Sequence, residues 1–151
     1  MTPRPPPKLR DYPGIYGAGL ALVILTMTTL LCCRVFGSEV PQHVLAGLAR
    51  VESSSYFRPD GSLRYVNQAR GKDGEVGPFQ ALPATLRQHG FSPSLYEQDR
   101  SYSLMATRAI LCKYHQRVGN WHDAIACWHR PYDYKSTRAQ SYARKVAEAI
   151  Q

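Results

Sequence analysis

The residues best suited to chemistry lie between positions 51 and 85 of this 151-residue chain. Glu52 directly follows a set of apolar residues with helical spacing, whose last member is Val51. A carboxylate at the C-terminus of a helix, beside a buried face, feels the negative end of the helix dipole and loses solvent. Both effects raise the pKa of the carboxyl. Glu52 is therefore a candidate general acid near neutral pH, and a solvated glutamate at a helix end is the alternative.

Groups that suit a sugar ligand lie close to Glu52 in the sequence. Ser53 and Ser54 follow it and can donate hydrogen bonds to a carboxylate or to a sugar hydroxyl. The tetrapeptide Gly-Pro-Phe-Gln at 77–80 predicts a rigid turn that presents the amide of Gln80. An amide is a suitable partner for the hydroxyl and acetamido groups of a sugar.

Two further carboxylates, Asp73 and Glu75, precede this turn in a loop. Either is a candidate second carboxylate, and one that held a water would turn the cleavage into hydrolysis. Three histidines, His115, His122 and His129, follow at seven-residue intervals that match no common metal site. We therefore expect neither a metal nor a cofactor.

The elements that position these residues are mostly helices. Apolar spacing and stop signals predict helices at 38–51, 83–89, 101–118, 121–128 and 136–150. Gly119 fits a C-cap and Asn120 an N-cap. The stripe predicted for the helix at 101–118 runs through Leu104, Met105, Ile110, Tyr114 and Val118. Residues 55–80 lack a helical period, and 62–66 alternate like a strand. The fold class is therefore mainly α, with a minor β-ribbon or loop lobe.

The first 37 residues indicate delivery to a membrane. Residues 1–13 are Pro-rich and basic and predict a tail without a core. The 20 residues from 14 to 33 carry no charge, which predicts a transmembrane anchor at 14–36. Basic residues before the anchor favour a cytoplasmic tail and an exported domain at 38–151. A cleaved signal peptide, which would give a secreted protein, stays open as the alternative.

The net charge of +8 divides unevenly. Residues 38–151 hold 15 Lys and Arg against 10 Asp and Glu, a balance of +5, and the first 37 residues hold 4 against 1, a balance of +3. A basic domain suits an anionic membrane surface, bacterial cell wall or nucleic acid. Because the basic residues are scattered and do not alternate with aromatic ones, we expect no nucleic-acid partner.

Four short motifs together resemble those of the lysozyme-like lytic transglycosylases, the soluble lytic transglycosylase (SLT) superfamily. Glu52-Ser53 resembles the catalytic E-S motif. The turn at 77–80, followed by Pro-Ala-Thr at 83–85, resembles G-L-M-Q…P-x-T. The stretch 124–129 (Ala-Ile-Ala-Cys-Trp-His) stands where the family has A-x-A-Y-N, and 142–146 (Tyr-Ala-Arg-Lys-Val) is similar to the closing Y-A-x-K-V. The resemblance covers about residues 40–150 and implies a small lysozyme-like helical domain.

The resemblance implies cleavage of the MurNAc–GlcNAc β-1,4 bond of peptidoglycan. Glu52 would protonate the glycosidic oxygen and then act as base on the MurNAc 6-hydroxyl, which gives a 1,6-anhydro end without water. Gln80 would bind the sugar near the bond, and Ser53 would orient Glu52 or its substrate. The implied substrate-binding residues are Ser53, Ser54, Gly77, Phe79, Gln80, Trp128 and Tyr142.

The chain departs from the family pattern around Trp128. Trp-His-Arg-Pro at 128–131 replaces Y-N-x-G, so the family's tyrosine near the catalytic glutamate is missing there. Either Trp128 stacks on a sugar ring, or Tyr132, Tyr134 or Tyr142 supplies the hydroxyl. Phe79 stands where the family has Met, which is an apolar exchange.

Two cysteines, Cys112 and Cys127, lie on consecutive predicted helices joined by a tight connection. Antiparallel neighbours can bring such residues within bridging distance, and an exported domain meets an oxidising compartment. A disulfide would close a loop of about 15 residues and contribute roughly 3 kcal/mol. We expect this bridge, with two buried thiols as the alternative.

These inferences favour a lytic transglycosylase in the periplasm, held in the inner membrane by one helix. Its partners would be peptidoglycan glycan strands and an envelope-spanning secretion, conjugation or pilus complex, or a phage system. Two alternatives of related fold stay open: a muramidase that uses water, and a wall-binding module that does not cut. A basic nucleic-acid binder is a fourth, and it would need a contiguous basic face.

Overall fold

The structure is a computed structural model that describes residues 39–65 and 70–149. The chain divides after Gly37, and all of the described residues belong to the unit Ser38–Gln151. Within the described ranges, no helix combines the length and the apolar character needed to cross a membrane. The anchor predicted at 14–36 lies outside the described residues.

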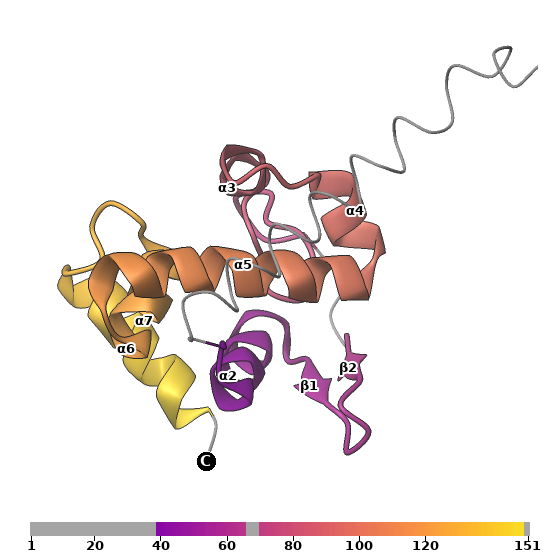
Figure 1. Cartoon of the computed structure of the whole chain (residues 1–151), viewed down its shortest axis with the longest axis horizontal. Helices are drawn as coiled ribbons and strands as arrows, with labels where there is room; N and C mark the ends of the chain where they lie inside the picture. Colours follow the sequence, from indigo (N-terminus) through magenta and orange to yellow (C-terminus); the bar gives the residue numbers. More distant parts are fainter. Residues whose placement is uncertain (1–38, 66–69, 150–151) are drawn as a thin grey trace, which may run out of the picture. The chain divides into compact units, whose positions relative to one another are not determined.

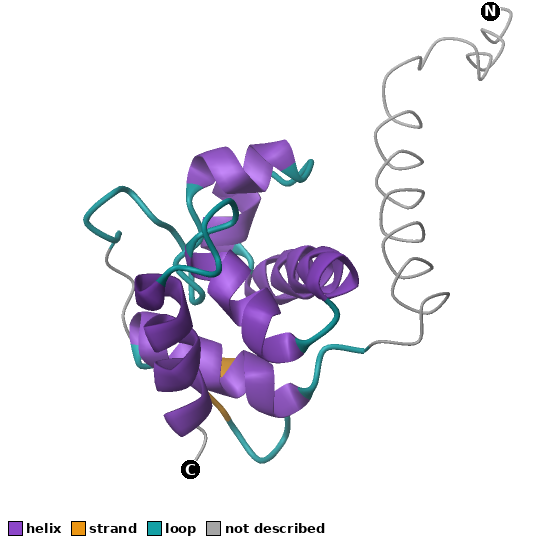
Figure 2. Cartoon of the chain, turned by 90° about the vertical axis from the view of Figure 1, so that its left-hand side faces the viewer, coloured by secondary structure: helices purple, strands orange, loops and turns teal. Residues whose placement is uncertain are grey.

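The described part is mainly helical, as predicted (Figures 1 and 2). Strands β1 and β2 form one antiparallel ribbon in which Tyr56 pairs with Arg64 and Phe57 with Leu63. This ribbon is the small β lobe expected between the first two predicted helices. The elements are α2 (Gln42–Ser53), β1 (Tyr56–Phe57), β2 (Leu63–Arg64), α3 (Pro83–Gln88), α4 (Pro93–Gln98), α5 (Arg100–Val118), α6 (Trp121–His129) and α7 (Thr137–Glu148).

Helix α5 runs through the middle of the helical assembly (Figure 1). Helices α4 and α6 pack against it, and α7 packs against both α6 and α2. Because α5 has neighbours on more than one side, four consecutive residues at 109–112 are buried. The stripe predicted from spacing is therefore too narrow, and its members Leu104, Met105 and Val118 are only half-buried.

Local signals explain most helix ends. Gly119 ends α5 in the left-handed conformation at φ +82°, and the Asn120 side chain accepts from Asp123 N at 2.8 Å to start α6. Both caps were predicted. Helix α4 was not predicted, although Ser92 caps it and Pro93 occupies its first turn, because it is only 6 residues long.

Helix α2 begins later than the sequence predicts and ends near the predicted stop at 52–54. Pro41 stands just before its first residue, Gln42, and the helix continues through Ser53. Ser54 then adopts the left-handed conformation at φ +57° and donates its N–H to Arg50 O at 3.1 Å. Glu52 therefore lies within the last turn of α2, where the helix dipole disfavours a negative charge.

The core connects the helices on both sides of α5. Its largest fully buried side chains come from all six helices α2 to α7 and from the turn at 77–80. They include Leu45, Leu48, Phe79, Leu86, Tyr96, Ile110, Leu111 and Val146.

Candidate active site

A pocket of about 270 Å³ opens beside the end of α2. Its walls come from α2, the loop and turn at 75–82, α3, the end of α6 and the middle of α7. The lining residues are Val51, Glu52, Glu75, Gln80, Ala81, Leu82, Thr85, Trp128, His129, Pro131, Tyr142 and Lys145. Segments from across the domain therefore meet around one carboxyl group, Glu52.

The pKa of Glu52 is raised to about 7, mainly because burial disfavours the charged form, with a smaller contribution from the nearby charge of Glu75. A hydrogen bond from Tyr142 and the positive charge of Lys145 lower the pKa of Glu52, but not enough to cancel the loss of solvent. The carboxyl is therefore divided between its protonated and ionised forms near neutral pH, which suits a group that gives and then takes a proton.

Tyr142 on α7 donates its hydroxyl hydrogen to Oε1 of Glu52. Burial, together with the neighbouring carboxylate, raises the pKa of Tyr142, so its hydroxyl keeps the proton that it donates. Among the tyrosines proposed to replace the family's missing one, Tyr142 is the one that contacts Glu52. Tyr132 is 83 % exposed and bonds elsewhere.

Ser53 supports the pocket from behind. It is buried, with its Oγ 2.6 Å from Pro78 O, 3.3 Å from Ala49 O and 2.6 Å from Ser55 Oγ. A hydroxyl donates a single proton, and Pro78 O lies closer to Ser53 Oγ than Ala49 O does, so Pro78 O is the better of these two acceptors. Ser53 therefore connects α2 to the turn at 77–80 and does not face the pocket, contrary to the prediction that it binds substrate.

The turn at 77–80 presents one of its predicted contact residues and buries the others. Val76 and Ala81 flank this turn, and each donates its backbone N–H to the carbonyl oxygen of the other at 3.0 Å. Phe79 is fully buried, and Gly77 packs so closely that a Cβ there would lie 2.7 Å from the Tyr96 ring. Gly77 and Phe79 therefore shape the wall rather than touch a ligand, and Gln80 lines the pocket.

The structure separates the two candidate second carboxylates. Glu75 lines the pocket, and its charge acts on Glu52. Asp73 is exposed and absent from the lining, and its backbone N–H donates to Glu75 Oε2 at 2.9 Å. Asp73 therefore helps to fix Glu75, which is the better placed of the two. Ser54 is also exposed and outside the lining.

Among the ionisable residues of the lining, His129 and Lys145 were not predicted as site residues. His129 stacks on Tyr142, with ring centroids 4.5 Å apart and planes 13° from parallel. Lys145 follows Tyr142 by three residues on α7, so the two share a helix face. That spacing was a usable signal for Lys145. The position of His129 depends on how α6 meets α7, which spacing does not show.

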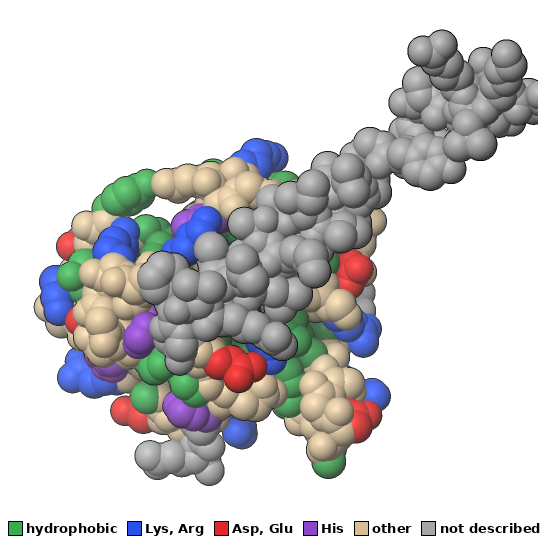
Figure 3. Space-filling view, viewed as in Figure 1, with side chains coloured by type: hydrophobic (Ala, Val, Ile, Leu, Met, Phe, Trp, Pro, Cys, Tyr) green, Lys and Arg blue, Asp and Glu red, His purple; other side chains and the backbone are tan. Residues whose placement is uncertain are grey.

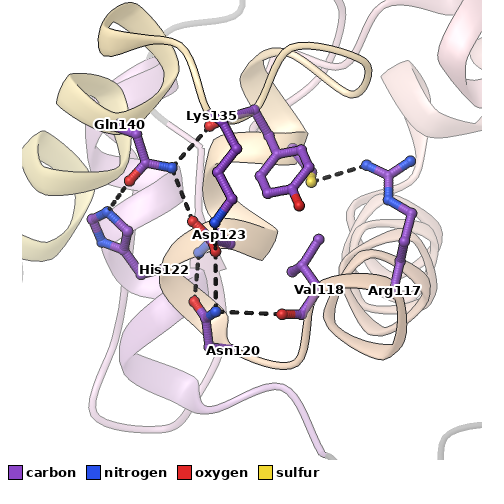
Figure 4. Close-up of polar contacts among 9 residues, drawn as sticks. Arg117, Val118, Asn120, His122, Asp123, Lys135 and Gln140 are labelled. Carbon is purple, nitrogen blue, oxygen red and sulfur yellow. Dashed lines mark hydrogen bonds and ion pairs between the residues drawn. The ribbon is translucent and has the colours of Figure 1, made fainter.

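The loop between α6 and α7 is tied to its surroundings at several points. Arg117 donates to Pro131 O at 2.7 Å. Asp123 accepts from Lys135 at 2.8 Å and from Gln140 at 2.9 Å (Figure 4). These partners and Asn120 hold the pKa of Asp123 at about 2, so this carboxylate is charged at neutral pH. The network fixes the ends of the two helices that bring His129 and Tyr142 together.

A hydrogen bond also connects the loop between α6 and α7 to α3, which forms another wall of the pocket. Gln88 at the end of α3 donates to the hydroxyl of Tyr132 at 3.0 Å, and both side chains are exposed. Leu82 and Thr85 of the α3 wall and Pro131 of the loop line the pocket. The Gln88–Tyr132 hydrogen bond therefore bridges these two walls.

The predicted disulfide does not form. Cys112 and Cys127 are both buried thiols. The Sγ of Cys127 accepts a hydrogen bond from Arg117 at 2.9 Å, so this side chain is directed to the guanidinium at the end of α5. Within residues 39–65 and 70–149, no group of three or more His, Cys, Asp or Glu is placed to hold a metal ion.

Comparison of the chain with protein-family models, with curated proteins and with solved structures finds no match. The chemistry of the pocket is therefore argued from its own residues.

Proposed function

We propose that the chain is a peptidoglycan lytic transglycosylase with Glu52 as its single acid and base. The observation that carries the proposal is the state of Glu52, a half-buried carboxyl with a pKa of about 7 that accepts a hydrogen bond from Tyr142. The amide of Gln80 and the indole of Trp128 line the same pocket. These are groups that bind sugar hydroxyl and acetamido groups and stack on sugar rings.

In the proposed reaction, protonated Glu52 gives its proton to the glycosidic oxygen as the bond from C1 of MurNAc to that oxygen breaks. The 6-hydroxyl of the same MurNAc then attacks C1. Glu52, now a carboxylate, accepts the proton of that hydroxyl and returns to its starting form. Water is not consumed, and the product carries a 1,6-anhydro end.

Tyr142 and Lys145 suit the second half of this cycle. A hydrogen bond from Tyr142 and the charge of Lys145 both favour ionised Glu52. They would stabilise the carboxylate between proton donation and proton return, while burial keeps the carboxyl a competent acid at the start.

The test uses the full chain, the Glu52→Gln variant and a Glu148→Gln control at an exposed position of α7. Each is incubated with purified peptidoglycan, and the soluble products are analysed by mass spectrometry. We expect anhydro-ended muropeptides from the parent and the control, and a loss of at least ~100-fold for Glu52→Gln. Full activity of Glu52→Gln would contradict the proposal.

A hydrolase is the second candidate, because Glu75 lines the same pocket. If Glu75 held a water, the products would have reducing ends labelled by ¹⁸O from the solvent, and Glu75→Gln would abolish the labelling. A folded parent that binds the wall without any product would instead indicate a binding module.

We also propose that residues 14–36 anchor the protein in the inner membrane and that 38–151 act in the periplasm. The absence of a charge from 14 to 33 supports this. A compact wall-cutting domain on such an anchor suits local opening of the wall for a secretion, conjugation or pilus machine. Protease protection of the tail in inverted and right-side-out vesicles tests the orientation.

A further inference from the structure

Tyr142 makes two contacts in the pocket, one through its hydroxyl and one through its ring. Its hydroxyl donates to Glu52, and its ring lies against the imidazole of His129 at a centroid distance of 4.5 Å and an angle of 13°. Both rings line the pocket. In the other ring pairs of the described residues, neither ring belongs to a residue that lines the pocket.

The imidazole is presented from a fixed support. His129 is the last residue of α6, and Tyr142 lies in the middle of α7, so the stack spans the junction of the two helices. Lys135 and Gln140 both donate to Asp123 of α6, which ties α6 to the start of α7 and to the loop before it (Figure 4). With the helices fixed, the ring of His129 limits how far the ring of Tyr142 can turn.

We propose that His129 is a positioning residue that acts through Tyr142: its ring holds the tyrosine hydroxyl on the carboxyl of Glu52. The inference rests on the proposed role of Glu52 as acid and base. Hydrogen bonds to a carboxylate are strong only when donor and acceptor are well aligned. A tyrosine free to swing would lose this alignment when Glu52 is charged and must wait for its second proton.

Burial lowers the pKa of His129, and Arg138 and Arg130 lower it further. The imidazole is therefore neutral at neutral pH. A neutral ring stacks on the phenol without adding a charge next to Glu52, which agrees with a packing role rather than proton transfer.

A double-mutant cycle tests the inference on the full chain. It compares the parent, His129→Ala, Tyr142→Phe and the double variant, with kcat and KM measured on peptidoglycan. We expect His129→Ala to lower kcat about tenfold with KM changed less than about twofold. In the Tyr142→Phe background, which keeps the ring and lacks the hydroxyl, the same change should have less than about a twofold effect.

Two controls separate positioning from general packing. His129→Phe keeps a flat ring and should restore most of kcat. His115→Ala removes another stacked histidine, whose ring lies 4.1 Å from that of Trp121 outside the pocket lining, and should leave kcat unchanged. A loss from His129→Ala that persists in the Tyr142→Phe background, or that appears in KM, would overturn the inference, because it would mean that His129 acts independently of the hydroxyl.

A measurement that needs no catalysis keeps the two proposals separate. The carboxyl pKa of Glu52 is followed by ¹³C NMR in the same four proteins. Loss of the Tyr142 hydrogen bond should raise the pKa of Glu52, so His129→Ala should raise it in the parent and not in the Tyr142→Phe background. That result with an inactive parent would reject the transglycosylase and keep the positioning role; an unchanged or lowered pKa would reject the positioning role.

Discussion

At Glu52, loss of solvent outweighs the contacts that favour a negative charge. Burial is the largest influence on its pKa, and the opposing hydrogen bond from Tyr142 and charge of Lys145 leave the value at about 7. An ordinary glutamate has a pKa near 4.5. Because folding raises this pKa, protonation of Glu52 is coupled to the stability of the fold.

Replacement of Glu52 by Gln should therefore stabilise the protein at high pH. The folded state holds a proton on Glu52 more tightly than the unfolded state does, so the free energy of unfolding falls as pH rises from about 4.5 to about 7. Over this window the free energy of unfolding of the parent falls by up to about 3 kcal/mol. Glu52→Gln cannot ionise, so its free energy of unfolding does not fall for this reason. Urea unfolding should show Glu52→Gln to be more stable than the parent at pH 8 and similar to it at pH 4. An equal difference at both pH values would contradict the assigned burial.

Lys145 should lower the upper pH limit of activity that burial of Glu52 sets. Its charge favours ionised Glu52, so Lys145→Met should raise the pKa of Glu52 and shift the alkaline limb of the kcat/KM profile to higher pH. Arg144→Met is the matched control, since Arg144 donates to Ser141 Oγ and does not line the pocket. A profile that moved equally in both variants would indicate a general effect of net charge.

The residues of the site were only partly predictable. Glu52 could be found because its chemistry depends on a local feature, the end of an apolar helical pattern. The partner hydroxyl of Tyr142 lies 90 residues away, and the sequence left several aromatic candidates open. The stack of His129 on Tyr142 depends on the crossing of α6 and α7, which side-chain packing decides.

At the scale of elements, the turn at 77–80 carries the strongest local constraint. Gly77 has φ +76°, and an added Cβ would meet the Tyr96 ring at 2.7 Å. Gly74 has φ +82° with open space around it. The two glycines share a backbone requirement and differ in their surroundings, which makes them a matched pair.

Gly77→Ala should be clearly more destabilising than Gly74→Ala. Both changes place an alanine in the left-handed region, which costs about 1 kcal/mol. The contact with Tyr96 should add a further ~1–3 kcal/mol at Gly77. Urea unfolding of both variants measures the difference, and equal losses would show that Tyr96 does not hold the turn. Gly77→Ala should also lower cleavage, because the turn carries Gln80.

Capping residues helped where they flank a long apolar pattern. Helices α5 and α6 were predicted nearly to their ends, because Gly119 and Asn120 carry their own stop and start signals. Helix α4 was missed because 6 residues are too few for an apolar period to show. Apolar spacing also underestimated α5, since a helix with neighbours on several sides buries small and polar residues such as Ala106 and Thr107.

At the scale of the whole molecule, charge and thiols both bear on the setting in which the domain works. Figure 3 shows the basic side chains spread over the viewed face rather than gathered into one patch. On this face, the described residues form no contiguous basic patch of the kind that a nucleic-acid binder would need.

Cys112 and Cys127 should remain thiols in the folded protein, even under oxidising conditions. Their exposed fractions are 3 % and 0 %, and Cys127 is engaged by Arg117. Peptide mapping by mass spectrometry should find that a thiol reagent labels both cysteines readily in the unfolded protein. In the native protein, labelling should be at least ~100-fold slower. A cross-linked peptide joining the two cysteines, isolated from native protein, would contradict the structure and support the bridge expected from the sequence.

The hydrogen bond from Gln88 to Tyr132 joins two walls of the pocket through two exposed side chains. One such bond contributes about 1 kcal/mol, so roughly one molecule in six has it broken at any moment. Exposed side chains change rotamer within about nanoseconds, whereas enzymes typically turn over about 1–1,000 times per second. Under the proposed function, opening of this bridge is therefore too fast to limit turnover.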